Sequence, residues 1–132
     1  MIIGITGNIG SGKTTVAKMF ERLGAFIIDA DKVCHFLMLP PKPVYKKIVA
    51  MFGWGILKKN KAIDRKKLAE IVFKNRPKLI LLNKIVHPAA IREVQRIIRD
   101  NRKKKLIVID AALLVESGFY KKMDKIVMVW VE

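Results

Sequence analysis

The sequence predicts a three-layer α/β/α fold built on a parallel β-sheet. Four apolar runs, at residues 2–6, 26–28, 106–109 and 126–131, lack the alternation of half-exposed strands, so we expect strands covered on both faces. Segments with helical character separate these runs, as βα units require. Ligands of such sheets bind beyond the C-terminal strand ends, where we therefore look for a site.

A phosphate-loop pattern follows the first strand directly. Residues 7–15 read Gly-Asn-Ile-Gly-Ser-Gly-Lys-Thr-Thr and match G-x-x-x-x-G-K-[ST] at every fixed position. Glycines let the backbone wrap around an anion, and a helix starting near Gly12 adds its positive dipole end. We expect Lys13 to reach the β- and γ-phosphates and the Thr14 hydroxyl to hold Mg²⁺. The pattern predicts a nucleoside triphosphate site formed by Asn8, Ile9, Gly10, Ser11, Gly12, Lys13, Thr14 and Thr15.

The loop leads into a helix expected at residues 12–23, closed by Gly24 as a C′ residue. Its apolar residues recur at helical spacing and predict one inward face, made of Val16, Met19, Phe20 and Leu23.

A long, mostly helical stretch, residues 32–102, interrupts the strands. Turn signals divide it at residues 40–43, 53–55, 76–77 and 87–88. We expect Asp64 to cap one helix, residues 78–86 to form a buried helix, and Pro88 to begin the next one. Core packing is the preferred role for its methionines and aromatic residues, namely Phe36, Met38, Met51, Phe52, Trp54 and Phe73. The prediction is a core of residues 1–31 and 103–132 with a helical insert of residues 32–102.

Carboxylates follow two of the predicted strands. Asp29 and Asp31 come after the second strand, and Asp110 after the third. Asp31 is the preferred general base for a substrate hydroxyl, with Asp29 as its competitor or as a group that orients the substrate. Asp110 occupies a Walker-B-like position suited to Mg²⁺. Polar strand ends that simply face water are the alternative.

Other single residues carry weaker signals. His87 precedes a proline and fits a structural hydrogen-bonding role better than a ligand contact. Arg65 fits a bidentate phosphate contact and a surface arginine equally well. Cys34, the only cysteine, fits a small buried apolar group and a reducing cytoplasm.

The amino-acid composition indicates which classes of ligand the protein can bind. The formal net charge of +16, from 27 basic and 11 acidic residues, favours anionic ligands. The basic residues are scattered without interleaved aromatic residues, so we prefer a solvated surface to a nucleic-acid interface. No apolar run approaches the ~18 residues of a membrane helix, and no signal peptide is expected.

Taken together, these motifs resemble the dephospho-coenzyme A kinase family. The resemblance rests on residues 4–17, on Leu23-Gly24-Ala25 and on Asp29-Ala30-Asp31. Further matches follow in family order: Phe52-Gly53, Ile63-Asp64-Arg65, Val72-Phe73, Leu82-Asn83, His87-Pro88 and Leu113-Leu114-Val115-Glu116.

The resemblance implies a fold of the P-loop nucleoside triphosphate hydrolase type and an ATP- and Mg²⁺-dependent phosphorylation of the ribose 3′-hydroxyl of dephospho-coenzyme A. It implies that residues 10–15 bind ATP, that Lys13 stabilises the transferred group and that Asp31 is the base. It makes the helical insert the coenzyme A-binding domain. Substrate contacts are expected at Thr6, Asp29, Arg65, His87, Leu113 and Leu114.

The sequence departs from the family pattern at two points. Ala112 stands where the family usually has proline. The family also continues into a lid with a catalytic arginine and into a further strand, and we expect both to be absent from this chain. Another P-loop nucleotide kinase or hydrolase is the alternative activity, and a nucleic-acid-binding module the alternative class.

Overall fold

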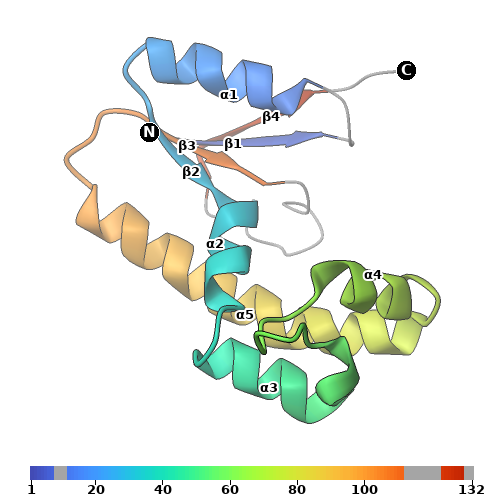
Figure 1. The fold of residues 1–132 in the computed structure, drawn as a ribbon. Helices are drawn as coiled ribbons and strands as arrows, with labels where there is room; N and C mark the ends of the chain where they lie inside the picture. The colour runs from blue at the N-terminus through green and yellow to red at the C-terminus, as the bar shows by residue number, and fades with distance from the viewer. Residues whose placement is uncertain (8–11, 112–122, 130–132) are drawn as a thin grey trace. The chain divides into compact units, whose positions relative to one another are not determined.

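The predicted parallel sheet is present. In the computed structural model, which describes residues 1–7, 12–111 and 123–129, four strands lie in the order β2-β3-β1-β4 (Figure 1). All three neighbouring pairs are parallel, which confirms the α/β fold. The elements are β1 (Ile2–Gly7), α1 (Lys13–Arg22), β2 (Phe26–Asp29), α2 (Ala30–Leu37), α3 (Pro43–Phe52), η1 (Trp54–Ile56), α4 (Arg65–Phe73), α5 (Arg76–Asp100), β3 (Ile107–Asp110) and β4 (Lys125–Val129).

The chain divides into two compact units. The first comprises Met1–Lys32 and Glu93–Glu132, and the second comprises Val33–Arg92. The first unit contains the sheet, and the second is helical apart from an isolated bridge between Leu57 and Ile63. None of the helices in residues 12–111 combines the length and apolarity of a membrane-spanning segment.

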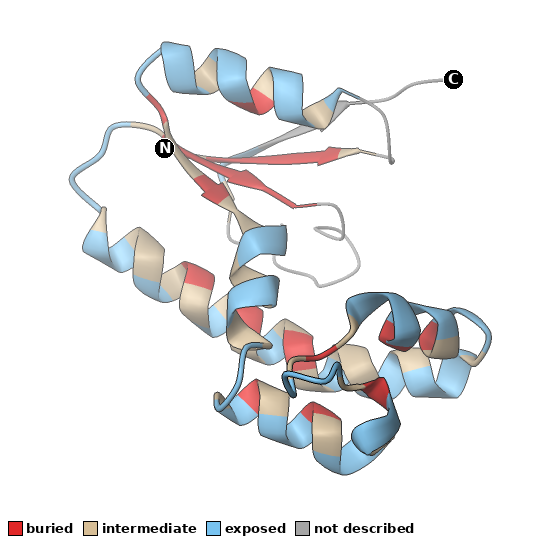
Figure 2. Cartoon of the chain, in the orientation of Figure 1, coloured by how far each residue is buried: buried red, intermediate tan, exposed pale blue. Residues whose placement is uncertain are grey.

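Strand β3 is buried along its whole length, as is most of β1 (Figure 2). One apolar cluster of this unit joins Ile3, Ile5 and Val108 of the sheet to Ala17 of α1, with Phe20 packed against it. The face predicted for α1 is therefore only partly correct. Val16 and Phe20 pack inward, whereas Met19 and Leu23 are exposed, because the buried stripe is rotated toward Ala17.

The end of α1 follows the predicted glycine stop. Gly24 has a φ of 95°, a left-handed conformation that glycine adopts without a Cβ penalty. The Ala25 N–H donates to the Phe20 carbonyl at 3.1 Å and the Gly24 N–H to the Glu21 carbonyl at 3.0 Å, the two bonds of a Schellman motif. The chain thus turns directly from α1 into β2.

The first residues of β1 are tied to the start of β4. The Ile2 N–H donates to the Asp124 carboxylate at 2.7 Å, and the Asp124 N–H donates to the Ile2 carbonyl at 2.9 Å. Asp124 therefore lies where these strands begin, at the edge of the sheet opposite to their carboxyl ends.

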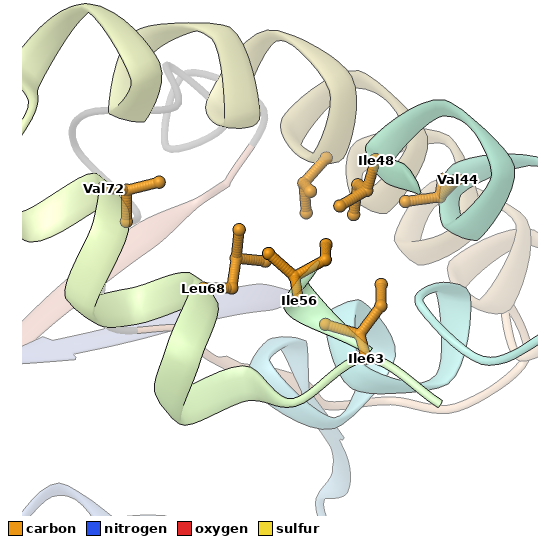
Figure 3. Close-up of a cluster of buried hydrophobic side chains, with 7 residues drawn as sticks. Val44, Ile48, Ile56, Ile63, Leu68 and Val72 are labelled. Carbon is orange, nitrogen blue, oxygen red and sulfur yellow. The ribbon is translucent and has the colours of Figure 1, made fainter. Parts of the chain in front are cut away.

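The helical unit has its own core. Apolar side chains from α3, η1, α4 and α5 point toward one another (Figure 3). They are Val44, Ile48, Ile56, Ile63, Leu68, Val72 and Val86. Asp64 caps α4 as predicted, since its carboxylate accepts hydrogen bonds from the Lys66 and Lys67 N–H groups. This unit therefore buries apolar surface without help from the sheet.

Three expectations for this unit were wrong. Helix α5 does not divide at His87-Pro88 but runs through Pro88. The proline lacks a backbone donor and crowds the carbonyl four residues earlier, but buried Val86 and Ala90 lie on either side of it within the helix. Residues 78–86 are helical but not a buried helix, since Ile80 and Leu81 are exposed.

The aromatic and methionine residues of the insert are the third error. Trp54 and Phe73 are 76% and 91% exposed, and Phe36 and Met51 are exposed as well. Only Met38 and Phe52 of the predicted set pack against the core. Isoleucine, valine and leucine fill the centre instead, and these large residues lie at its margin or outside it.

Candidate functional site

The phosphate loop connects β1 to α1. Strand β1 ends at Gly7, and α1 begins at Lys13, after Gly12. Gly12 has φ 85° and ψ 15°, a left-handed conformation that requires glycine, and its carbonyl accepts the first α1 bond from the Val16 N–H. The predicted ATP contacts Asn8, Ile9, Gly10 and Ser11 lie outside the described residues. The described ends of the loop have the strand-to-helix context that the motif requires.

The strand register brings the predicted carboxylates together. Asp29 of β2 pairs with Asp110 of β3, and Asp110 pairs with Ile5 of β1. Neighbouring strands lie about 4.8 Å apart, so these ends form one short edge. Thr6 and Asp110 are the buried polar residues there, each 6% exposed. The expected convergence of the strand ends is therefore observed in this unit.

Lys13 forms an ion pair with Asp110. The Lys13 Nζ donates to Oδ1 of the Asp110 carboxylate, and the two side chains are 16% and 9% exposed. Lys13 comes from the first turn of α1 and Asp110 from the end of β3, 97 residues apart in sequence. The loop lysine and the predicted Mg²⁺ ligand therefore contact each other directly. The sequence pattern placed both residues at the site without predicting this contact.

The two carboxylates after β2 have different environments. Asp29 Oδ1 accepts hydrogen bonds from the Asp31 N–H at 3.0 Å and the Lys32 N–H at 3.2 Å. Asp29 thus acts as the N-terminal cap of α2. Asp31 lies in the first turn of α2 and is exposed. The positive end of the helix dipole stabilises its charged form there. Asp29 therefore holds the first turn of α2 through these two bonds, whereas Asp31 is an exposed residue of that turn.

Oxygen ligands suited to Mg²⁺ also lie near this edge. Thr14 is exposed in the first turn of α1, next to Lys13, and Asp110 supplies a carboxylate. Mg²⁺ prefers oxygen ligands and usually takes one or two carboxylates together with substrate phosphates. The chemistry of Thr14 and Asp110 therefore fits this ion. Thr15 is likewise exposed in this turn.

The remaining predicted site residues that the structure describes do not belong to the strands of the first unit. Arg65 and His87 belong to the helical unit, where Arg65 is exposed at the start of α4 and His87 is half-buried within α5. Leu113 and Leu114 lie outside the described residues. Arg65 contacts His35, a residue that sequence reasoning missed. The sequence signal that could have identified His35 is its spacing, since it follows Asp31 by four residues and so lies on the same side of α2.

Comparisons with known proteins match nearly the whole chain to one family. Residues 1–132 match the sequence model of the family described as dephospho-CoA kinase. A dephospho-CoA kinase of Aquifex aeolicus is 48% identical over 128 residues, covering 97% of this chain and 65% of that protein. The corresponding protein of Carboxydothermus hydrogenoformans is 42% identical over 132 residues, covering 98% of this chain and 64% of that protein.

Solved structures show the same fold. A Thermus thermophilus protein superposes with a TM-score of 0.79 at 28% identity, covering 98% of this chain and 64% of its own. A dephospho-CoA kinase from Campylobacter jejuni superposes with a TM-score of 0.72 at 33% identity, covering 96% of this chain and 64% of its own. The chain thus spans slightly less than two thirds of the length of these relatives.

Proposed function

This chain belongs to the dephospho-CoA kinase family, and we propose that it transfers the γ-phosphoryl group of ATP to the ribose 3′-hydroxyl of dephospho-coenzyme A, giving coenzyme A and ADP. The observation that carries the proposal is the convergence of the phosphate-loop lysine, a buried carboxylate and a carboxylate-bearing helix start on one edge of the sheet. Together they supply an anion site, an oxygen ligand and a base.

In the proposed reaction Asp31 takes the proton of the 3′-hydroxyl. The ribose oxygen then bonds to the γ-phosphorus while the bond from that phosphorus to the bridging β,γ-oxygen breaks, and ADP leaves with the electron pair. Charge grows on the phosphoryl oxygens and on the leaving group, where the Lys13 ammonium stabilises it. To do so, Lys13 exchanges the Asp110 carboxylate for phosphate oxygens.

Thr14 and Asp110 would hold Mg²⁺ in this scheme. The ion would supply neutralising charge to the β- and γ-phosphates. Release of Lys13 from Asp110 makes that carboxylate available as a ligand. Asp29 keeps its capping bonds throughout and so holds the first turn of α2, and with it Asp31, at the end of β2.

The acceptor contacts remain proposals. Thr6 and Asp29 are assigned to the strand-end side of the acceptor, Arg65 and His87 to the helical unit, and Leu113 and Leu114 to the segment after β3. The helical unit is proposed to bind the coenzyme A portion, and its separate core supports a distinct binding module. The single cysteine suits a reducing compartment, so the cytoplasm is the proposed location.

The test compares the two carboxylates after β2. Asp31→Asn keeps the side-chain shape but cannot accept the proton, so turnover with ATP and dephospho-coenzyme A should fall ~10²–10⁴-fold. Nucleotide affinity should stay nearly constant, because Asp31 is not assigned to the phosphate loop. Asp29→Asn is the matched control and should lose much less activity, since an amide oxygen still caps the helix. A large loss for Asp29→Asn with a small one for Asp31→Asn would reverse the two roles.

A further inference from the structure

The Asp110 carboxylate, a proposed ligand of Mg²⁺, is occupied by a cation of the chain itself. Its Oδ1 accepts a hydrogen bond from the Lys13 Nζ, and the Asp110 side chain is 9% exposed. Strand β3 lies between β2 and β1, so Asp110 has a strand on either side and little contact with solvent. Among the ion pairs of the described residues, Lys13 is the one partner of Asp110. A metal ion that enters this site must therefore displace Lys13 or lie beside it.

The charge balance of the pair determines what the site accepts. Lys13 and Asp110 neutralise each other, and a divalent ion alone would add positive charge beside an ammonium that is only 16% exposed. Like charges repel strongly where solvent screens them weakly, and a buried charge that loses its partner is left uncompensated. The phosphates of a nucleotide change this balance, because they supply negative charge for both the lysine and the metal.

The other oxygen groups near this edge do not replace Asp110. Thr14 is exposed in the first turn of α1, but Mg²⁺ is usually bound through one or two carboxylates in addition to phosphates. Asp29 is paired with Asp110 across the strands, and its Oδ1 caps α2. Binding of the ion therefore depends on whether the Asp110 carboxylate is accessible to it.

We propose that Lys13 masks Asp110 from divalent cations until the phosphates of a nucleotide draw the lysine away. The inference rests on the proposed function and adds an order of binding to it. The metal enters with the nucleotide or after it, and the nucleotide-free site rejects the free ion. Lysine carries its ammonium on a flexible aliphatic stem, so a rotation of the side chain is enough for the exchange. Because coupling between two ligands is reciprocal, the metal in turn strengthens nucleotide binding.

The experiment measures binding of Mn²⁺ to the nucleotide-free chain by electron paramagnetic resonance, in which the signal of the free ion falls on binding. Mn²⁺ takes the same oxygen ligands as Mg²⁺. Lys13→Met keeps the aliphatic stem and removes the ammonium. Its Mn²⁺ affinity should be about tenfold higher than that of the unaltered chain, because a charge-assisted hydrogen bond no longer competes with the metal. Equal affinities in the two chains would overturn the proposal.

Two matched variants locate the effect. Lys18→Met removes the same charge from an exposed position of the same helix, and should change Mn²⁺ affinity less than about twofold. Combining Lys13→Met with Asp110→Asn removes the unmasked carboxylate, and the gain in affinity should disappear. An equal gain in Lys18→Met would show a diffuse charge effect, and a gain that persists in the double variant would place the metal elsewhere. Either result contradicts the masking of Asp110.

Thermal unfolding separates a change in metal binding from a loss of structure. Lys13→Met leaves Asp110 without its cation, and Mn²⁺ should raise the unfolding temperature of this variant more than that of the unaltered chain. If Lys13→Met does not fold, Lys13→Gln takes its place, because an uncharged amide can still donate to Asp110. Lys13→Gln should also bind Mn²⁺ more tightly than the unaltered chain, and an affinity no higher than that of the unaltered chain would overturn the proposal.

A final arm tests the order of binding. With saturating ADP, the unaltered chain should bind Mn²⁺ more tightly than free ADP does, and Asp110→Asn should lose that difference. No difference in the unaltered chain would contradict unmasking by the nucleotide. Failure of the masking and failure of the proposed function are distinguishable, because these titrations contain no dephospho-coenzyme A. Equal Mn²⁺ affinities with phosphorylation of dephospho-coenzyme A refute the masking alone, whereas a gain in Lys13→Met without that phosphorylation in the unaltered chain refutes the activity alone.

Discussion

Asp110→Asn should tighten nucleotide binding in the absence of Mg²⁺ and remove the benefit of Mg²⁺. The reason is the ion pair between Asp110 and Lys13. The Asp110 carboxylate binds the Lys13 ammonium, which is the group proposed to bind the phosphates of the nucleotide. An ammonium ion cannot serve both partners fully, so Asp110 and ADP compete for Lys13 when no metal is present. In the proposed scheme the same carboxylate would hold Mg²⁺ and so would favour the nucleotide when the metal is present. The substitution should therefore act in opposite directions under the two conditions.

The magnitude follows from the burial of the pair. The side chains of Lys13 and Asp110 are only 16% and 9% exposed, so solvent screens their interaction weakly. A hydrogen bond to a charged group contributes ~1.5–3 kcal/mol, and asparagine retains part of it through its amide oxygen. We expect a net release of about 1.4 kcal/mol, which is about a tenfold gain in affinity for ADP without Mg²⁺.

Isothermal titration calorimetry with ADP, in EDTA and then in excess Mg²⁺, measures both conditions. Asp124→Asn is the matched control, because it removes one negative charge at the edge of the sheet where β1 and β4 begin. Its ADP affinity should change less than about twofold in either condition. Weaker binding of Asp110→Asn in EDTA, or an unchanged response to Mg²⁺, would refute the competition between Asp110 and phosphate for Lys13.

Two further predictions concern catalysis and stability. Lys13→Ala should abolish measurable transfer to dephospho-coenzyme A while the secondary structure persists, as checked by activity assay and circular dichroism; unchanged turnover would remove Lys13 from the mechanism. Ile48→Ala should lower the free energy of unfolding by ~2–5 kcal/mol, because Ile48 is fully buried in the helical core, whereas Met51→Ala on the same helix should cost far less; chemical denaturation that ranks the two in the opposite order would contradict the burial described for α3.

The sequence predicted the parts of the site that follow from the positions of the strand ends, but not the contacts between its side chains. Parallel strands place their carboxyl ends on one edge, so Asp29 and Asp110 were expected at the same edge once the strands were recognised. That β2 and β3 are neighbours, with Asp29 paired to Asp110, is known from the structure. The contact between Lys13 and Asp110 depends on a side-chain choice that no periodicity encodes. The division between Asp29 and Asp31 was also left open, because only the structure shows which carboxylate receives the N–H groups of α2.

Helix boundaries and burial were predicted less well, for physical reasons. Pro88 was expected to interrupt a helix, but α5 continues through it with buried Val86 and Ala90 on either side. A turn signal read from proline alone does not include the packing of the neighbouring turns. Met19 and Leu23 share a helix face with Val16 and Phe20, and a small rotation toward Ala17 decides which of them are covered. Phe73 was also expected to be buried, but it is exposed. It is the last residue of α4, and a hydrophobic residue at the end of a helix need not pack against another element.

The most direct test of the central claim is to identify the phosphorylated product. The protein is incubated with ATP, Mg²⁺ and dephospho-coenzyme A, and the product is analysed by mass spectrometry and ³¹P NMR. The account predicts one ADP for each coenzyme A formed, with the new phosphate on the ribose 3′-oxygen. ADP formation that proceeds equally without dephospho-coenzyme A, or a phosphate on another acceptor atom, would contradict it.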